Sequence, residues 1–311
     1  MDVDALVEGV LAGERRAVAR AISAVEDGAD DLEALSEGIF ASTGRAATVG
    51  LTGAPGVGKS TLAAGLVRAC RARDLRAAVL AVDPTSPYTG GALLGDRVRM
   101  QEHATDPSVF IRSMATRGHL GGMALAAPEA VRILDAAGYD RVAVETVGVG
   151  QAEVDVAAAT DTAVVVLAPG MGDAVQMAKA GILEVADVFV VNKGDRDGAA
   201  EVVRELRQML HLGAAREWDP PVLTTMAVDD EGIDDLWEAI ESHRAHLAAT
   251  GALAGKRRAR LLREVEALTA ERFRLQVASA LADDAALVED LVERRIDPYR
   301  AAAMLVGEAV G

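Results

Sequence analysis

The sequence predicts an α/β fold: a doubly wound, mostly parallel sheet with helical extensions at both ends. Seven short apolar runs, most of them separated by helical stretches, lie between residues 47 and 240. A glycine-rich segment, G-x-x-x-x-G-K-S, follows the first run and precedes a helical stretch. The two ends of the chain show helical spacing and no such runs. Strands that alternate with helices indicate a parallel sheet with helices on both faces.

Composition limits the classes of function. The 311 residues are half apolar and carry a formal net charge of −16. Nucleic acids and anionic membranes attract basic surfaces, so neither is expected as a main partner. Cys70, the one cysteine, excludes an intrachain disulfide and favours a reducing compartment. The acidic N-terminus lacks a signal-peptide pattern and no apolar run approaches membrane-spanning length. We therefore expect a cytoplasmic protein.

The helical spacing of apolar residues divides the chain into three expected parts. Residues 1–46 form an N-terminal helical extension, with Arg15, Arg16 and Arg20 on its outer face. Residues 47–240 form the sheet domain, and residues 241–311 form a C-terminal helical arm. The strand candidates are residues 47–51, 77–82, 108–112, 141–145, 162–167, 188–191 and 221–224. Ligands of such sheets bind beyond the carboxyl ends of the strands, so the segments after each strand are the informative ones.

The segment after the first strand matches the phosphate-binding P-loop. Glycines allow the backbone to approach phosphate oxygens, and the N–H groups at the start of the next helix point at the anion. Lys59 is expected to reach the β- and γ-phosphates, and the Ser60 hydroxyl to bind Mg²⁺. Cys70 lies on the apolar side of that helix, where we expect packing rather than chemistry. The expected phosphate-binding residues are Gly53, Ala54, Pro55, Gly56, Val57, Gly58, Lys59, Ser60 and Thr61.

Acidic residues follow the second and fourth strands. Asp83 precedes two prolines that enforce a rigid turn, so its carboxylate is suited to Mg²⁺ binding through water. Asp96 lies in the next glycine-bearing loop and is either a metal ligand or a surface carboxylate. Glu145 ends the fourth strand and is expected to hold or polarise metal-bound water. Gly148 follows in a turn and is expected to sense a γ-phosphate through its backbone N–H.

The loop after the fifth strand ends at Lys179. Basic residues here are mostly arginine, 28 against 4 lysines, and two of the lysines fall inside nucleotide motifs. Lys179 lies at the same edge of the sheet, so we expect a functional role, with a plain surface lysine as the alternative. The loop after the third strand holds Arg117 and His119, to which no role is assigned.

The segment after the sixth strand, residues 192–195, matches N-K-x-D. Asp195 can accept hydrogen bonds from the guanine ring N–H and exocyclic amine, a donor pair that adenine lacks. Asn192 is expected to bond nearby ring atoms, and the Lys193 stem to cover the base plane. After the last strand, a backbone N–H is expected to meet the guanine oxygen; this segment consists of Thr225, Met226 and Ala227.

The C-terminal arm begins with a charged amphipathic helix at residues 256–281, and Pro298 starts a last helix. The apolar stripes of these helices must be covered either by the same chain or by a second copy.

With these motifs in hand, the chain resembles the MeaB/ArgK-type GTPases, the methylmalonyl-CoA mutase-associated G proteins of the SIMIBI class of P-loop proteins. The resemblance covers nearly the whole chain. It rests on the helix at 15–22, GAPGVGKST (53–61), VDPTSP (82–87), LGDRVRM (94–100), SMATRGHLGG (113–122), ETVGVGQ (145–151) and NKGD (192–195).

The resemblance implies a GTP-hydrolysing chaperone of an adenosylcobalamin-dependent acyl-CoA mutase, which gates cofactor loading and protects or reactivates the mutase. It implies that Ser60 and Asp96 bind Mg²⁺ and that Asp83 and Glu145 orient water and metal. It places Gly148 in a second switch. It makes residues 168–179 a third mobile segment, with Lys179 as the residue through which the mutase stimulates hydrolysis.

The resemblance also implies a homodimer formed through the C-terminal helices. At Thr225, Met226 and Ala227 the sequence departs from the Ser-Ala pair that is commoner in the family, but that contact would use backbone atoms.

Alternative functions remain open at this point. The mutase served could act on methylmalonyl-, isobutyryl-, ethylmalonyl- or hydroxyisobutyryl-CoA. A small-molecule kinase on the same fold would need an acceptor pocket with a general base, which the sequence does not show. A nickel-delivery GTPase would need a Cys/His cluster, whereas the chain has one cysteine and five scattered histidines. Without a catalytic histidine or an internal arginine finger, intrinsic hydrolysis is expected to be slow and stimulated by a partner.

Overall fold

The computed structural model describes residues 2–29, 31–83, 105–115, 122–146, 152–170, 183–212 and 216–310. Its contacts divide the chain into two compact units, Met1–Arg260 and Leu261–Gly311. The boundary expected from the sequence, at residue 240, falls inside helix α11 (Ile233–Thr250).

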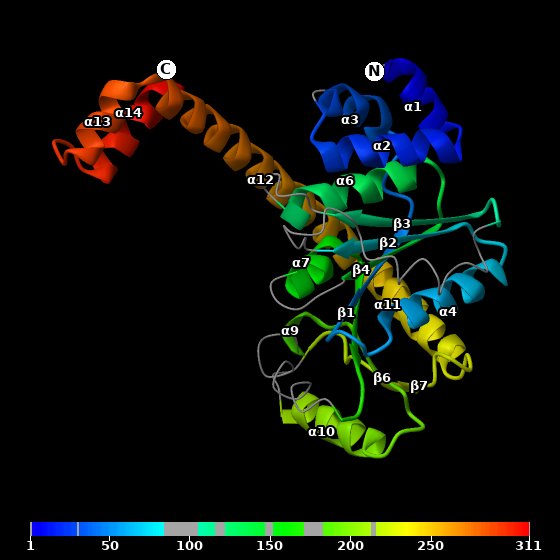
Figure 1. Ribbon diagram of the computed structural model, residues 1–311. Coiled ribbons are helices and arrows are strands. Elements are labelled where there is room, and N and C mark those ends of the chain that lie inside the picture. The colour runs from blue at the N-terminus through cyan, green and yellow to red at the C-terminus, as the bar shows by residue number, and fades with distance from the viewer. Residues whose placement is uncertain are drawn as a thin grey trace. The chain divides into compact units, whose positions relative to one another are not determined.

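A seven-stranded sheet with the order β3-β2-β4-β1-β5-β6-β7 is the centre of the first unit (Figure 1). Every strand pair in it is parallel. The strands are β1 (Ala47–Thr52), β2 (Ala77–Asp83), β3 (Val109–Ala115), β4 (Arg141–Thr146), β5 (Thr162–Leu167), β6 (Val188–Asn192) and β7 (Val222–Thr225). Each predicted strand is present and starts within one residue of its expected position. The predicted doubly wound α/β fold is confirmed.

Helices cover both faces of this sheet. The core on one face contains residues of α4 (Lys59–Arg71) and α11 together with Val49, Val79 and Val164. The opposite face is covered by α6 (Gly122–Ala136) and α7 (Ala152–Ala159). Towards β7 that opposite face is covered by α10 (Ala199–Leu212), and the short helix α9 (Leu183–Val185) precedes β6. Because successive strand residues point to opposite faces, these cores use alternate positions of the same strands.

Three N-terminal helices form a further layer beyond α6 (Figure 1). They are α1 (Val3–Leu11), α2 (Arg15–Asp27) and α3 (Leu32–Phe40). Their apolar sides are buried, with Val10, Val18 and Ile22 fully excluded from solvent. The N-terminal helical extension predicted from apolar spacing is therefore a packed part of the first unit.

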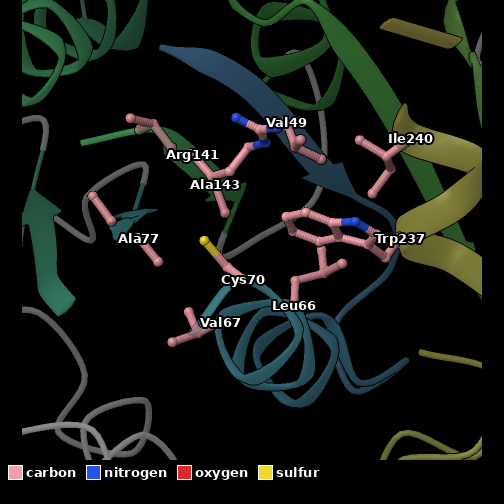
Figure 2. A pocket seen from close by; sticks show the side chains of 11 residues that line it. Val49, Leu66, Val67, Cys70, Ala77, Arg141, Ala143, Trp237 and Ile240 are labelled. Carbon is pink, nitrogen blue, oxygen red and sulfur yellow. The ribbon is translucent and has the colours of Figure 1, made fainter. Parts of the chain in front are cut away.

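A small cavity of about 30 Å³ lies between α4, α11 and the sheet. Figure 2 shows Cys70 and Leu66 of α4 facing Trp237 of α11 across it. Burial raises the pKa of the Cys70 thiol to about 11, so the thiol is protonated at neutral pH. The packing role predicted for Cys70 agrees with this environment.

The N-terminal part of α12 (Ala252–Asp283) is fixed to the sheet by a group of charges that we call the Asp161 cluster: Asp161, Arg257 and Arg260. Asp161 is only 2% exposed and accepts hydrogen bonds from Arg257 at 2.7 Å and Arg260 at 2.9 Å. Its own backbone N–H donates to the Thr48 hydroxyl at 2.7 Å. Arg257 also donates to the carbonyl of Ala46. The cluster thus links α12 to the strands β1 and β5.

Burial alone would raise the pKa of Asp161. The hydrogen bond from Arg257 and the charges of Arg260 and Arg257 outweigh it, so the pKa of this carboxyl lies below its ordinary value. A neighbouring carboxylate, Asp187, is held in the same way by His243 at 3.2 Å and Lys256 at 3.1 Å. The charges of this part of α12 are therefore structural contacts rather than a solvated face.

The second unit contains the rest of α12 with α13 (Ala285–Val292) and α14 (Pro298–Val310). Its small core is built around Leu287, Ala301 and Leu305. The carboxylate of Asp297 accepts hydrogen bonds from the first N–H groups of α14, which starts at Pro298 as predicted. In the part of the chain that the structure describes, no helix has the length and hydropathy needed to cross a bilayer.

Candidate functional site

The polar segments predicted to form a site follow the carboxyl ends of parallel strands. The P-loop follows β1, Glu145 lies at the end of β4, Asn192 ends β6 and Thr225 ends β7. Because the strands are parallel, these ends lie along one edge of the sheet. The structure therefore brings segments more than 130 residues apart in sequence to one edge.

The P-loop depends on two glycines. A side chain at Gly53 (φ +136°) would collide with the backbone carbonyl of Val166 on β5. A side chain at Gly58 (φ +103°) would collide with the amide of Asn192. Both have backbone conformations that other residues rarely adopt, so only glycine fits both the loop and its neighbours. The loop leads into the N-terminus of α4, where backbone N–H groups favour an anion.

Lys59 and Ser60 are buried at the first turn of α4. The Lys59 ammonium donates to the carbonyls of Gly53 at 2.7 Å and Ala54 at 3.1 Å, which holds it inside the curve of the loop. The Ser60 hydroxyl donates to the Glu145 carboxylate at 2.6 Å. This bond unites two residues that the sequence placed separately at a metal site.

Asn192 connects the phosphate loop to the segment after β7. Its amide donates to the carbonyl of Val57 at 2.8 Å. Its carbonyl oxygen accepts from the Thr225 hydroxyl at 3.0 Å and from the backbone N–H of Ala227 at 3.1 Å. All of these groups are buried. Asn192 therefore fixes the relative position of the two halves of the predicted nucleotide site.

A pocket of about 660 Å³ opens beside these residues. Gly56, Gly58 and Thr61 line its phosphate end, and Asp195 and Lys193 line the predicted base end. Lys193 has a left-handed backbone (φ +60°), and its ammonium donates to the carbonyl of Gly56 at 2.6 Å. The lysine stem is thus held across the pocket between the two motifs.

The remaining predicted residues are placed only in part. Asp83 ends β2 at the same edge, opposite Ala115 of β3, but its side chain is outside the description. Asp96, Gly148 and Lys179 lie outside the described residues. Pro55, Met226 and Ala227 lie in the loops that border the pocket, and Met226 and Ala227 line it.

The pocket also contains residues that were not predicted from sequence. Ala64 and Arg68 of α4, Arg196, and Val228 and Asp229 after β7 all line it. The spacing of Thr61, Ala64 and Arg68 places all three on one face of the helix after the P-loop. This periodicity is the sequence feature from which Ala64 and Arg68 could have been predicted to line the pocket. Val228 is 85% exposed, an unusual position for an apolar side chain.

The parallel sheet, the glycine loop before α4 and the N-K-x-D segment at one edge define a P-loop GTPase. A family model described as "Methylmalonyl Co-A mutase-associated GTPase MeaB" matches residues 18–282. The chain belongs to this MeaB family, and the recognition made from its motifs is confirmed.

Known proteins show the same relationship. A protein of Pyrococcus horikoshii named as a GTPase is 46% identical over 313 residues, covering 99% of each chain. The mouse "Methylmalonic aciduria type A homolog, mitochondrial" is 36% identical over 274 residues, covering 82% of this chain and 66% of the mouse protein. A crystal structure named "LAO/AO transport system kinase" superposes with a TM-score of 0.74 at 28% identity, covering 99% and 98% of the two chains. The chain is a GTP-hydrolysing enzyme of this family.

Proposed function

We propose that this GTPase is a chaperone of an adenosylcobalamin-dependent acyl-CoA mutase, with methylmalonyl-CoA mutase as the first candidate. In this role it gates cofactor loading and protects or reactivates the mutase in the cytoplasm. The observation that carries the nucleotide part is the single pocket lined by both the P-loop and the N-K-x-D segment. The mutase part is supported by the description of the family and by the name of the mouse relative.

The phosphate half of the pocket would hold the triphosphate on the N-terminus of α4, with the Lys59 ammonium at the β- and γ-phosphates. The oxygen atoms of Ser60 and Glu145 lie 2.6 Å apart, and hydroxyl and carboxylate oxygens are donors that suit Mg²⁺. We propose these two residues, with Asp83 and Asp96, as the magnesium site. The ion would neutralise charge on the phosphates. Glu145 would also orient the attacking water, and Gly148 would contact the γ-phosphate.

The base half of the pocket would select guanine. Asp195 would accept the ring N–H and exocyclic amine, while the Lys193 stem would cover the base. A backbone N–H of the Thr225–Ala227 segment would meet the guanine oxygen. In the structure the Ala227 N–H donates to Asn192 and the Met226 N–H to Glu231, so one of these bonds would be exchanged for the bond to guanine. The buried hydrogen bonds of Asn192 support this assignment. The choice of guanine over adenine depends on the Asp195 carboxylate.

Replacing Asp195 with Asn should shift preference from GTP towards XTP, because xanthine presents an oxygen where guanine has its amine. An asparagine amide can donate to that oxygen. Kd values for GDP and XDP, measured by calorimetry, would report the shift; we expect GDP to weaken at least about tenfold, from loss of charge-assisted bonds. Asp197→Asn, two residues further along the same exposed turn, is the control. Unchanged GDP affinity in Asp195→Asn would remove this residue from base recognition.

The Lys179 segment is proposed to transmit stimulation by the mutase. With wild-type protein, adding the mutase should raise the GTP turnover rate; no stimulation would contradict the proposed partner. In Lys179→Ala, basal turnover should persist while stimulation by the mutase falls, because the positive charge proposed to transmit that stimulation is absent. Lys179→Arg, which retains the charge, is the matched variant. Full stimulation of Lys179→Ala would exclude the lysine from this step without touching the chaperone proposal.

We also propose that the second unit pairs with a second copy of the chain. Exposed leucines on α12 recur every seven residues, at Leu261, Leu268 and Leu275, and Val265 lies beside them. Such a heptad stripe is typical of helix-to-helix packing. A homodimer through these helices, which the sequence resemblance implies, would remove the stripe from water.

A further inference from the structure

The base end of the pocket is bounded by a turn that contacts the P-loop helix. This turn, which we call the base turn, comprises Met226–Gly232 between β7 and α11. A pair of backbone hydrogen bonds between Met226 and Glu231 closes it. Its residues Met226 to Asp229 line the pocket together with Asn192, Lys193 and Asp195 of the N-K-x-D segment. The position of the base turn therefore sets the width available to a purine.

The base turn has a strained corner at Asp230. The backbone φ of Asp230 is +60°, a region that residues other than glycine seldom occupy, although aspartate and asparagine tolerate it best. The next residue but one, Gly232, also has a positive φ, and a side chain there would collide with the carbonyl of Thr224. Both positions therefore restrict the residues that this turn accepts.

Arg68 ties this corner to α4. Its guanidinium forms an ion pair with the Asp230 carboxylate, and 32% of the Arg68 side chain is exposed, against 53% for Asp230. Arg68 lies on the same face of α4 as Thr61 and Ala64, seven residues after Thr61, and all three line the pocket. The arginine therefore connects the helix that follows the phosphate loop to the turn that lines the proposed base site.

We propose that Arg68, acting through Asp230, is a positioning residue for guanine recognition. It holds the base turn at the distance from Asp195 at which a guanine can meet both walls. Half-exposed ion pairs add little to folding stability. The same pair can nevertheless alter binding, because a small outward shift of the turn removes the base from reach of Asp195. This inference rests on the proposed guanine site.

Two variants distinguish positioning of the base turn by Arg68 from electrostatic attraction of the nucleotide by its charge. Arg68→Ala removes the cation, whereas Asp230→Asn keeps a side chain that tolerates the positive φ and removes only the ion pair. If Arg68 merely attracted the anionic nucleotide, Asp230→Asn would leave the local field more positive and tighten binding. If Arg68 positions the turn, both variants weaken GDP binding, and the double variant is no worse than either single one.

The measurement is the Kd of GDP and of IDP for each variant, by calorimetry with Mg²⁺. IDP lacks the exocyclic amine that Asp195 would accept. We expect Kd for GDP to rise about fivefold in both single variants, which corresponds to the loss of about one ordinary hydrogen bond. IDP should weaken less, so the ratio of Kd for IDP to Kd for GDP should fall. A purely structural role would lower the melting temperature and leave that ratio unchanged.

Arg73→Ala is the matched control. Arg73 lies in the turn just after the same helix and pairs with Asp234 on α11 at 3.1 Å, but it does not line the pocket. Its Kd ratio should equal that of the wild type. Tighter GDP binding in Asp230→Asn, unchanged affinity in both variants, or an unchanged ratio would each overturn the inference. Failure of the wild type to bind GDP would overturn the guanine site itself, a result distinct from failure of Arg68.

Discussion

Replacing Lys59 with alanine is expected to abolish GTP hydrolysis. Lys59 is a buried cation, 6% exposed, in a protein whose net charge is −16. Its ammonium is fixed between the carbonyls of Gly53 and Ala54. The positive charge is therefore already positioned where negative charge would develop on the phosphates during hydrolysis. Charge placed in advance in a desolvated site acts more strongly than the same charge in water.

The expected loss in kcat is at least about a hundredfold, the size seen when one stabilising group is removed from a transition state. Phosphate release under saturating GTP would measure it. Arg73→Ala, in the turn after the same helix and away from the pocket, should retain near wild-type turnover. Thermal denaturation of both variants would confirm that they are folded. Near-normal hydrolysis by Lys59→Ala would refute the assignment of the P-loop.

Replacing Asp161 with Asn is expected to produce the largest loss of folding stability. Arg257 and Arg260 both donate to this carboxylate, and their side chains are 26% and 17% exposed. Removing one member of a buried ion pair leaves the others without compensation, at a cost of about 3 kcal/mol. Urea unfolding followed by tryptophan fluorescence would measure it, because Trp218 and Trp237 both lie in the first unit.

The same variant gives a pH dependence of known sign. The pKa of Asp161 is lowered in the folded protein from 3.8, so its contribution to stability is fully present above pH 3.8. It is lost as the pH falls through the folded value. The stability gap between wild type and Asp161→Asn should thus be constant from pH 7 to about 5 and shrink in stronger acid. Arg244→Ala, a more exposed arginine of α11, should lower stability by less than about 1 kcal/mol. A comparable loss of folding stability in both variants would show that the Asp161 cluster stabilises the fold no more than an exposed ion pair does.

Much of this architecture could be read from the sequence because it depends on local patterns. Buried parallel strands are short apolar runs, and all seven were visible as such. Gly53 and Gly58 were recognisable because their spacing with Lys59 and Ser60 repeats in phosphate loops. Asn192 and Asp195 were recognisable for the same reason. These motifs each occupy one contiguous segment.

The contacts that were missed join distant segments. Nothing in the sequence singled out Asp161, and Arg257 was only one residue of a charged amphipathic helix. Their pairing spans 96 residues. Periodicity reports which side of an element is buried but not which charge on another element it meets. Arg68 was missed for a similar reason, since its partner Asp230 lies 162 residues away. The roles of Asp96, Gly148 and Lys179 remain predictions.

The burial of Cys70 has a practical consequence for the open question of self-association. The chain has no other sulfhydryl, and this one is shielded and resists ionisation at neutral pH. A single cysteine placed on the outer face of α12 would then be the only site to take a maleimide or nitroxide. Spin-label distances between copies, or dye transfer between them, can therefore be measured on the otherwise native molecule, with and without nucleotide.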